Sequence, residues 1–105
     1  MKDVLDDIER WRTAGQRVAV ARLVDVEGSG PREPGAAMAV NEAGEVSGSV
    51  SGGCVEGAVL TEALAVLEGK RERGVISFGY SDDEAFAVGL TCGGTIHLFV
   101  EPLDW

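Results

Sequence analysis

Hydrophobic side chains recur along this chain at two spacings, one typical of helices and one typical of strands. Over residues 3–14 they recur at helical spacing among charged residues, at Val4, Leu5, Ile8 and Trp11. This spacing predicts an amphipathic helix that Gly15 ends. A second apolar stripe predicts a helix from about Cys54 to Glu68. The S-x-x-E pattern of residues 81–84 predicts a capped short helix over 85–88.

Alternating and β-branched segments between these helices predict five strands. The strands cover residues 17–26, 36–40, 45–50, 75–80 and 95–101. The second and third are expected to pair as an antiparallel hairpin, because Gly44 supplies the positive φ that a tight turn needs. Five strands interleaved with two or three helices predict an α/β fold built on a five-stranded mixed sheet.

Length, charge and cysteine content restrict the class of protein. The 105 residues suit a single domain over residues 1–105. A net charge of −9 disfavours nucleic acid and anionic membranes as partners. No apolar run approaches the roughly 20 residues of a membrane helix, and the acidic start is unlike a targeting peptide, so we expect a cytoplasmic protein. Its two cysteines are then expected to be reduced thiols.

The first cysteine stands where a predicted strand is followed by a predicted helix. Ser51, Gly52 and Gly53 precede Cys54 at this position. Amides at a helix start carry partial positive charge, so they attract an anion and lower the pKa of a cysteine there. The two glycines leave the main chain open to a ligand. The alternative interpretation is a tight turn over a small buried cysteine.

The second cysteine, Cys92, precedes Gly93 and Gly94 between a predicted helix and the last strand. Loops of this kind gather at one edge of an α/β sheet, so the two cysteines are able to face one pocket. Two alternatives stay open: Cys92 packs inertly under a glycine turn, or it forms a disulfide with Cys54.

An isolated arginine, Arg32, lies in the Gly- and Pro-rich loop of residues 28–35. Its guanidinium suits a bidentate contact with phosphate or carboxylate. The alternative is a surface ion pair with Glu33 or Glu27.

The remaining polar residues predict neither a catalytic nor a metal site. His97, the only histidine, is expected to be partly exposed on the last strand, on the face opposite Ile96. The acidic run at residues 82–84 is explained by helix capping. Two cysteines and one distant histidine are a poor ligand set for zinc.

Three phrases of the chain, in this order, resemble the N-terminal domain of the XdhC/CoxI family. They are GSGPREPGAAMAV at 28–40, GSVSGGCVEGAV at 48–59 and VGLTCGGTIHLFVEPL at 88–103. The resemblance implies an accessory factor for molybdenum hydroxylases of the xanthine dehydrogenase or carbon monoxide dehydrogenase type. Such a factor binds the molybdenum cofactor transiently, assists its sulfuration with a cysteine desulfurase, and inserts it into the apo-hydroxylase.

Carried over by motif, Cys54 is the cofactor-binding cysteine and Cys92 a second pocket residue. Molybdenum prefers sulfur ligands and the cofactor carries phosphate, so a thiolate beside helix-start amides offers a partner to each. Arg32 adds charge pairing. The resemblance therefore indicates a non-catalytic cofactor chaperone. Two alternatives stay open: a thiol enzyme that carries a persulfide or exchanges disulfides on Cys54, with Cys92 as the resolving thiol, or a structural docking module.

Many relatives carry a Rossmann-like domain after this one, whereas this sequence stops at Trp105. We expect a separate Rossmann-domain polypeptide, a partner protein or self-association as a homo-oligomer to take the place of that domain.

Overall fold

The computed structural model of the chain describes residues 2–27, 35–50, 56–78 and 95–103. Its helices and strands are α1 (Lys2–Thr13), β1 (Val18–Glu27), β2 (Ala37–Asn41), β3 (Val46–Gly48), α2 (Glu56–Leu67), β4 (Gly74–Phe78) and β5 (Thr95–Pro102). Each corresponds to a predicted element with its ends shifted by at most two residues. The short helix predicted over 85–88 lies outside the described residues.

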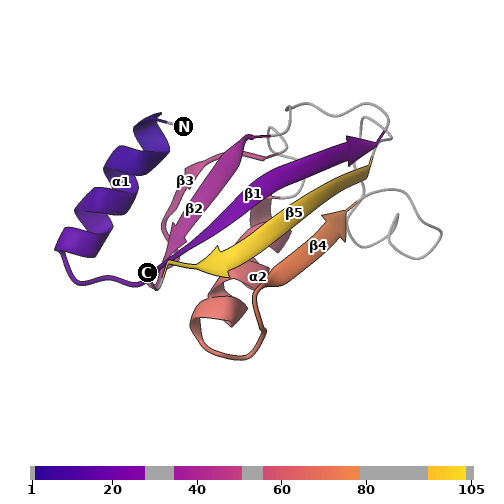
Figure 1. Cartoon of the computed structure of the whole chain (residues 1–105). Coiled ribbons are helices and arrows are strands. Elements are labelled where there is room, and N and C mark those ends of the chain that lie inside the picture. The colour runs from indigo at the N-terminus through magenta and orange to yellow at the C-terminus, as the bar shows by residue number, and fades with distance from the viewer. Residues whose placement is uncertain (1, 28–34, 51–55, 79–94, 104–105) are drawn as a thin grey trace.

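The five strands form one sheet in the order β3-β2-β1-β5-β4 (Figure 1). Every neighbouring pair is antiparallel, so the expectation of a mixed sheet was wrong. The reason is the path of the chain through α2. This helix connects β3 to β4, two strands that run the same way, as a crossover in a parallel sheet does. These strands lie at opposite edges of the sheet and therefore never pair.

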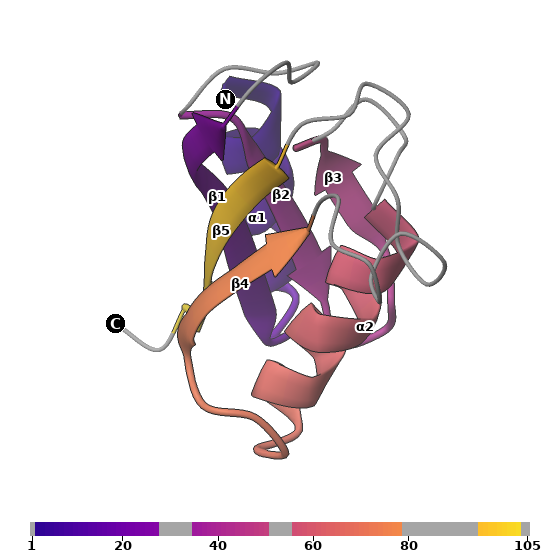
Figure 2. The ribbon, with the colours of Figure 1, turned by 90° about the vertical axis from the view of Figure 1, so that its right-hand side faces the viewer.

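The larger hydrophobic core fills the space between α2 and one face of the sheet (Figure 2). Alternate residues of β1 point into it, at Ala19, Ala21 and Leu23. The central positions of β5 on this face, Ile96 and Leu98, are fully buried. The alternation predicted from the sequence is thus the alternation between the two faces of the sheet.

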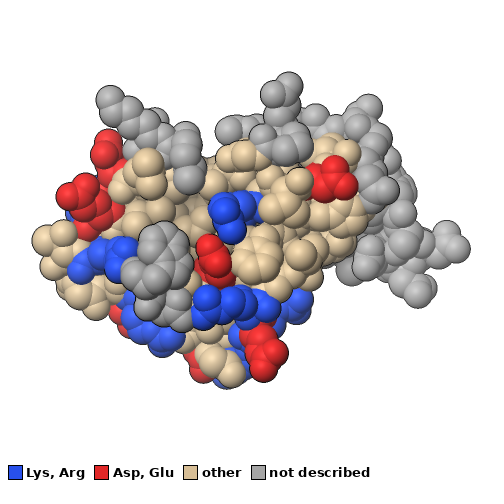
Figure 3. Space-filling view, viewed as in Figure 1, with Lys and Arg blue, Asp and Glu red and all other residues tan. Residues whose placement is uncertain are grey.

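A smaller core lies on the opposite face, where α1 packs over β1, β2 and β3. The helix contributes Val4, Ile8 and Trp11, and β1 contributes Val18 and Val20. Beyond α1 this face is less covered: Val75 of β4 is 58% exposed and Val24 of β1 is 48% exposed. Basic and acidic side chains are interspersed with uncharged ones across it (Figure 3).

The hairpin between β2 and β3 is held by Asn41, whose side chain is fully buried. The Asn41 amide nitrogen donates to Gln16 Oε1 and Glu45 Oε1, at 3.1 Å each. Its amide oxygen accepts from the main-chain nitrogens of Ala43 at 3.0 Å and Glu45 at 2.9 Å. Gly44 has a φ of 84°, which confirms the turn predicted from its position.

Candidate functional site

All predicted site residues fall in three segments outside the described residues. They are Arg32, then Ser51, Gly52, Gly53 and Cys54, and then Cys92, Gly93 and Gly94. The structure does describe the residues that flank each segment. The geometry of the candidate site is therefore the geometry of the scaffold that carries these segments.

The three segments are attached to the same end of the sheet. Because the strands alternate in direction, β1, β3 and β4 finish at the end of the sheet where β2 and β5 begin. Glu27 at the end of β1 pairs with Thr95 at the start of β5. Phe78 at the end of β4 pairs with Ile96. The end of β1, the start of β5 and the end of β4 thus lie side by side, and β3 ends at the same end of the sheet on its other edge (Figures 1 and 2).

The loop that carries Arg32 returns to β1 at Leu23, before the end of that strand. The Leu23 amide donates to the Ala36 carbonyl, and the Gly35 amide donates to the Leu23 carbonyl, at 2.8 Å each. β1 continues beyond these bonds from Leu23 to Glu27. A bulge between Leu23 and Asp25 interrupts the register of this extension with β5.

The segment that carries Cys54 is closed at its two ends by Glu56, the first residue of α2. Glu56 Oε2 accepts hydrogen bonds from Ser49 Oγ at 2.8 Å and from the Val50 amide at 2.9 Å. Val50 is fully buried and packs in the larger core. A carboxylate in the first turn of a helix is further stabilised by the helix dipole. Glu56 therefore joins the residues before the Cys54 segment to the helix after it.

Sequence reasoning gave Glu56 no role, although it is part of the phrase SGGCVE. One feature of the sequence pointed to this role: a glutamate near the predicted start of a helix, with a serine shortly before it in the chain. The sequence could not show that the Glu56 carboxylate comes within hydrogen-bond distance of the Val50 amide, six residues earlier in the chain.

Gly48, at the end of β3, packs against Ala37 of β2 and Val4 of α1. Its φ is 83°, a conformation that L side chains rarely adopt. A Cβ at this position would overlap the Ala37 carbonyl oxygen and would come within 2.7 Å of Val4 Cγ2. Gly48 is thus required for the close packing directly before Ser49.

His97 lies on β5, half-buried, on the face opposite Ile96, as predicted. Its Nδ1 is 2.6 Å from Ser77 Oγ of β4, and its register partner on β1 is Asp25. The described residues contain no group of three or more potential metal ligands among His, Cys, Asp and Glu.

Charged pairs also occur among the described residues of α2 and of the turn that follows it. Arg71 pairs with Glu62 at 2.9 Å, and Lys70 pairs with Glu68 at 2.8 Å. The hydrogen bond that Lys70 donates to the Glu68 carboxylate, together with the negative charge of Glu68, raises the pKa of Lys70 above its usual value. Both pairs are at the surface, where they contribute little to stability.

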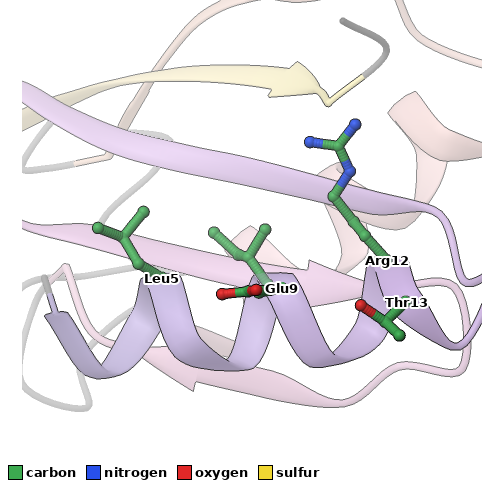
Figure 4. A pocket seen from close by; sticks show the side chains of 5 residues that line it. Leu5, Glu9, Arg12 and Thr13 are labelled. Atoms are coloured by element: carbon green, nitrogen blue, oxygen red, sulfur yellow. The ribbon is translucent and has the colours of Figure 1, made fainter.

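A hollow of about 390 Å³ lies along α1 (Figure 4). It is lined by Leu5, Ile8, Glu9, Arg12 and Thr13. None of the predicted site residues belongs to it. Within the described residues, no helix is long and apolar enough to cross a membrane.

A sequence model described as "XdhC and CoxI family" matches residues 11–79. The chain is 39% identical over 90 residues to a protein of Escherichia coli K12 named "Molybdenum cofactor insertion chaperone PaoD". That alignment covers 86% of this chain and 28% of the relative. A second relative, from Bacillus subtilis 168, is named as a probable subunit of xanthine dehydrogenase and is 33% identical over 88 residues. The alignment with it covers 82% of this chain and 26% of the relative.

The fold matches a solved structure described as a xanthine dehydrogenase from Bacillus halodurans. The TM-score is 0.77 and the sequence identity is 31%, over 97% of this chain and 31% of the other. This chain therefore spans less than a third of the length of these relatives.

Proposed function

Since this chain belongs to the XdhC and CoxI family, we propose that it binds the molybdenum cofactor and delivers it to a molybdenum hydroxylase. The observation that carries the proposal is its similarity to a protein named as a molybdenum cofactor insertion chaperone. The arrangement of the scaffold supports it, because three glycine-rich segments with candidate ligands are attached to one end of one sheet. We place this activity in the cytoplasm, where thiols stay reduced.

The residues proposed to hold the cofactor are those of the three segments. Cys54 offers a thiolate to the molybdenum, and Gly52 and Gly53 beside Ser51 let the ligand approach the main chain. Arg32 pairs with the phosphate. The bound cofactor supplies the metal that the client hydroxylase uses.

In this proposal Cys92, with Gly93 and Gly94 beside it, is a second group of residues that contacts the cofactor.

The scaffold fits such a ligand because Glu56 fixes both ends of the Cys54 segment. With Ser49 and Val50 bonded to the Glu56 carboxylate, the segment starts and finishes at defined points beside the first turn of α2. The start of a helix attracts anions, while the Glu56 carboxylate offsets part of that attraction. Glu56 thus orients the segment, and the positive groups that bind phosphate come from elsewhere, Arg32 among them.

The partners of this reaction are the apo-hydroxylase that receives the cofactor and a cysteine desulfurase that provides sulfur for it. In this proposal the chain itself is a carrier that holds the cofactor during sulfuration and handover.

The proposal is tested by purifying the protein from cells that make the cofactor and measuring bound molybdenum and pterin. We expect Cys54→Ser to lose most of the bound molybdenum while its circular dichroism and melting temperature stay unchanged. Cys92→Ser is the matched control, because it removes a thiol that is flanked by glycines in the same way. A smaller loss is expected there.

Two outcomes contradict this role. Molybdenum retained in full by Cys54→Ser excludes Cys54 as the ligand. A sulfur adduct on Cys54, found by mass spectrometry in a protein that never binds molybdenum, favours a persulfide-carrying enzyme instead.

A further inference from the structure

The outer edge of the sheet at β4 is unpaired in the part of the chain that the structure describes. β4 pairs with β5 on one side, from Gly74 opposite Val100 to Phe78 opposite Ile96, and it is the last strand of the sheet. Among the described strands, none pairs with the main-chain groups of β4 that point away from β5, which is how an edge strand offers itself to another extended chain.

This edge lacks the features that usually prevent strand pairing. Its sequence, GVISF, contains no charged residue and no proline, and its register with β5 is continuous. The opposite edge strand, β3, has only three residues. β4 is thus the edge of this sheet that is suited to add a strand.

The space beside β4 is a hollow of about 350 Å³. Its lining consists of β4 itself, from Val75 to Phe78, together with Glu62 of α2 and Arg71. The ion pair between Glu62 and Arg71 lies at its border, so the rim carries one charge of each sign. A neutral extended segment fits along such a groove better than a strongly charged one.

The sequence of β4 is complementary to itself. When two copies run antiparallel about a two-fold axis at Ile76, Phe78 lies opposite Gly74 and Val75 lies opposite Ser77. On the α2 face a large aromatic side chain then faces a glycine, a favourable cross-strand combination at a sheet edge. A Cβ on Gly74 would meet nothing within 4 Å in the single chain, so there is room above it.

We propose that β4 of one copy pairs with β4 of a second copy in this register, forming a continuous ten-stranded sheet across a two-fold dimer. A second copy is the occupant that the self-complementary strand specifies, and a two-fold interface needs one surface only. The interface consists of short strands and buries less than a standard protein–protein interface, so the dimer dissociates on dilution.

The test is sedimentation equilibrium over a wide concentration range on four forms of the 105-residue chain. The wild type is expected to dimerise. Val75→Lys/Ser77→Lys places two pairs of like charges directly across the two-fold axis, and we expect its dissociation constant to rise by about tenfold or more. Val75→Lys/Ser77→Glu places opposite charges at the same two positions and is expected to dimerise far more tightly than the first double variant.

Both double variants change the same two exposed positions and lose the same Ser77 hydroxyl, and residue 77 carries a positive charge in one and a negative charge in the other. Val24→Lys is the matched control. Val24 is an exposed valine on the same face of the sheet, but it lies on β1, which β5 separates from the edge strand. The dissociation constant of the Val24→Lys dimer is expected to equal that of the wild type.

A wild type that stays monomeric at every concentration overturns the proposal. Equal dissociation constants for the two double variants overturn the register. A measurement that needs no variant is amide hydrogen exchange of β4 in the wild type, which must slow as concentration rises. Unchanged exchange in β4 also overturns the proposal.

Discussion

Two polar residues hold separate parts of the backbone together through side-chain hydrogen bonds: Asn41 accepts from two main-chain amides, and Glu56 accepts from one main-chain amide and one hydroxyl. Asn41 uses its amide oxygen and nitrogen to close the β2–β3 hairpin and reach Gln16. Glu56 accepts from Ser49 and Val50 across the segment that carries Cys54. In both cases a single side chain replaces the regular ladder at a place where the backbone leaves the sheet.

Replacing Glu56 by alanine leaves the Val50 amide without its acceptor at a buried position. We expect Glu56→Ala to lower the free energy of unfolding by about 1–3 kcal/mol, as measured by urea denaturation. Glu56→Gln keeps an amide oxygen as acceptor, so a smaller loss is expected.

If the proposed function is right, Glu56→Ala also reduces molybdenum retention, and Glu56→Gln restores most of it. Equal stability of the two variants contradicts the role given to these hydrogen bonds. Reduced retention in Glu56→Ala that Glu56→Gln fails to restore shows that the negative charge, rather than the hydrogen bonds, matters to the ligand.

At the scale of elements, the contact of α1 with the β2–β3 hairpin depends on one glycine. Gly48 has a left-handed backbone, and the Ala37 carbonyl and Val4 occupy the place of its missing Cβ. Ser47, next to it, donates a hydrogen bond from its hydroxyl to Asp7 of α1. The helix is thus attached to the sheet through a site that tolerates no side chain.

We predict that Gly48→Ala lowers the free energy of unfolding by more than about 1 kcal/mol, because the alanine combines a strained φ with a steric overlap. Gly44→Ala is the control. Gly44 also has a positive φ, but a Cβ there meets nothing within 4 Å, so only the backbone strain is introduced. Thermal melts of the two variants separate the backbone strain from the steric overlap. Equal melting temperatures would contradict a contribution from the overlap at Gly48.

At the scale of the whole molecule, two hydrophobic cores lie on opposite faces of one sheet. The larger one joins α2 to β1, β2, β4 and β5, and the smaller one joins α1 to β1 and β2. Both depend on β1, whose residues alternate between them. A substitution that destabilises the larger core is therefore expected to lower the stability of the smaller core as well.

Leu98→Ala removes a fully buried side chain from the larger core and should cost about 2–5 kcal/mol. Cooperativity is checked in a Trp105→Phe background, where Trp11 of the smaller core is the only tryptophan. Trp11 fluorescence and far-ultraviolet circular dichroism are expected to shift to lower denaturant together. Val24→Ala, at an exposed position, should change stability by less than about 0.5 kcal/mol.

A fluorescence transition that stays at its original midpoint while circular dichroism shifts would show that α1 and its core unfold independently.

Much of the fold was predictable because local patterns carry it. The alternation of β1 and the helical spacing of Val4, Ile8 and Trp11 identify the strand, the helix and their buried faces. Gly15 and Gly44 mark the end of the helix and the hairpin turn, and both have positive φ. The family, too, was evident from three short phrases, and the match over residues 11–79 confirms it.

Strand direction and the role of Glu56 were not predictable in the same way. A helix between two strands that run the same way indicates parallel pairing, yet β3 and β4 lie at opposite edges of an antiparallel sheet. They do not become neighbours because β2, β1 and β5 lie between them.

The sequence by itself determined the elements, their buried faces and the family, because side-chain periodicity and backbone preference act over a few residues. Only the tertiary structure decided the strand order, the common end at which the three glycine-rich segments are attached and the bonds of Glu56. Those depend on contacts between residues far apart in the chain.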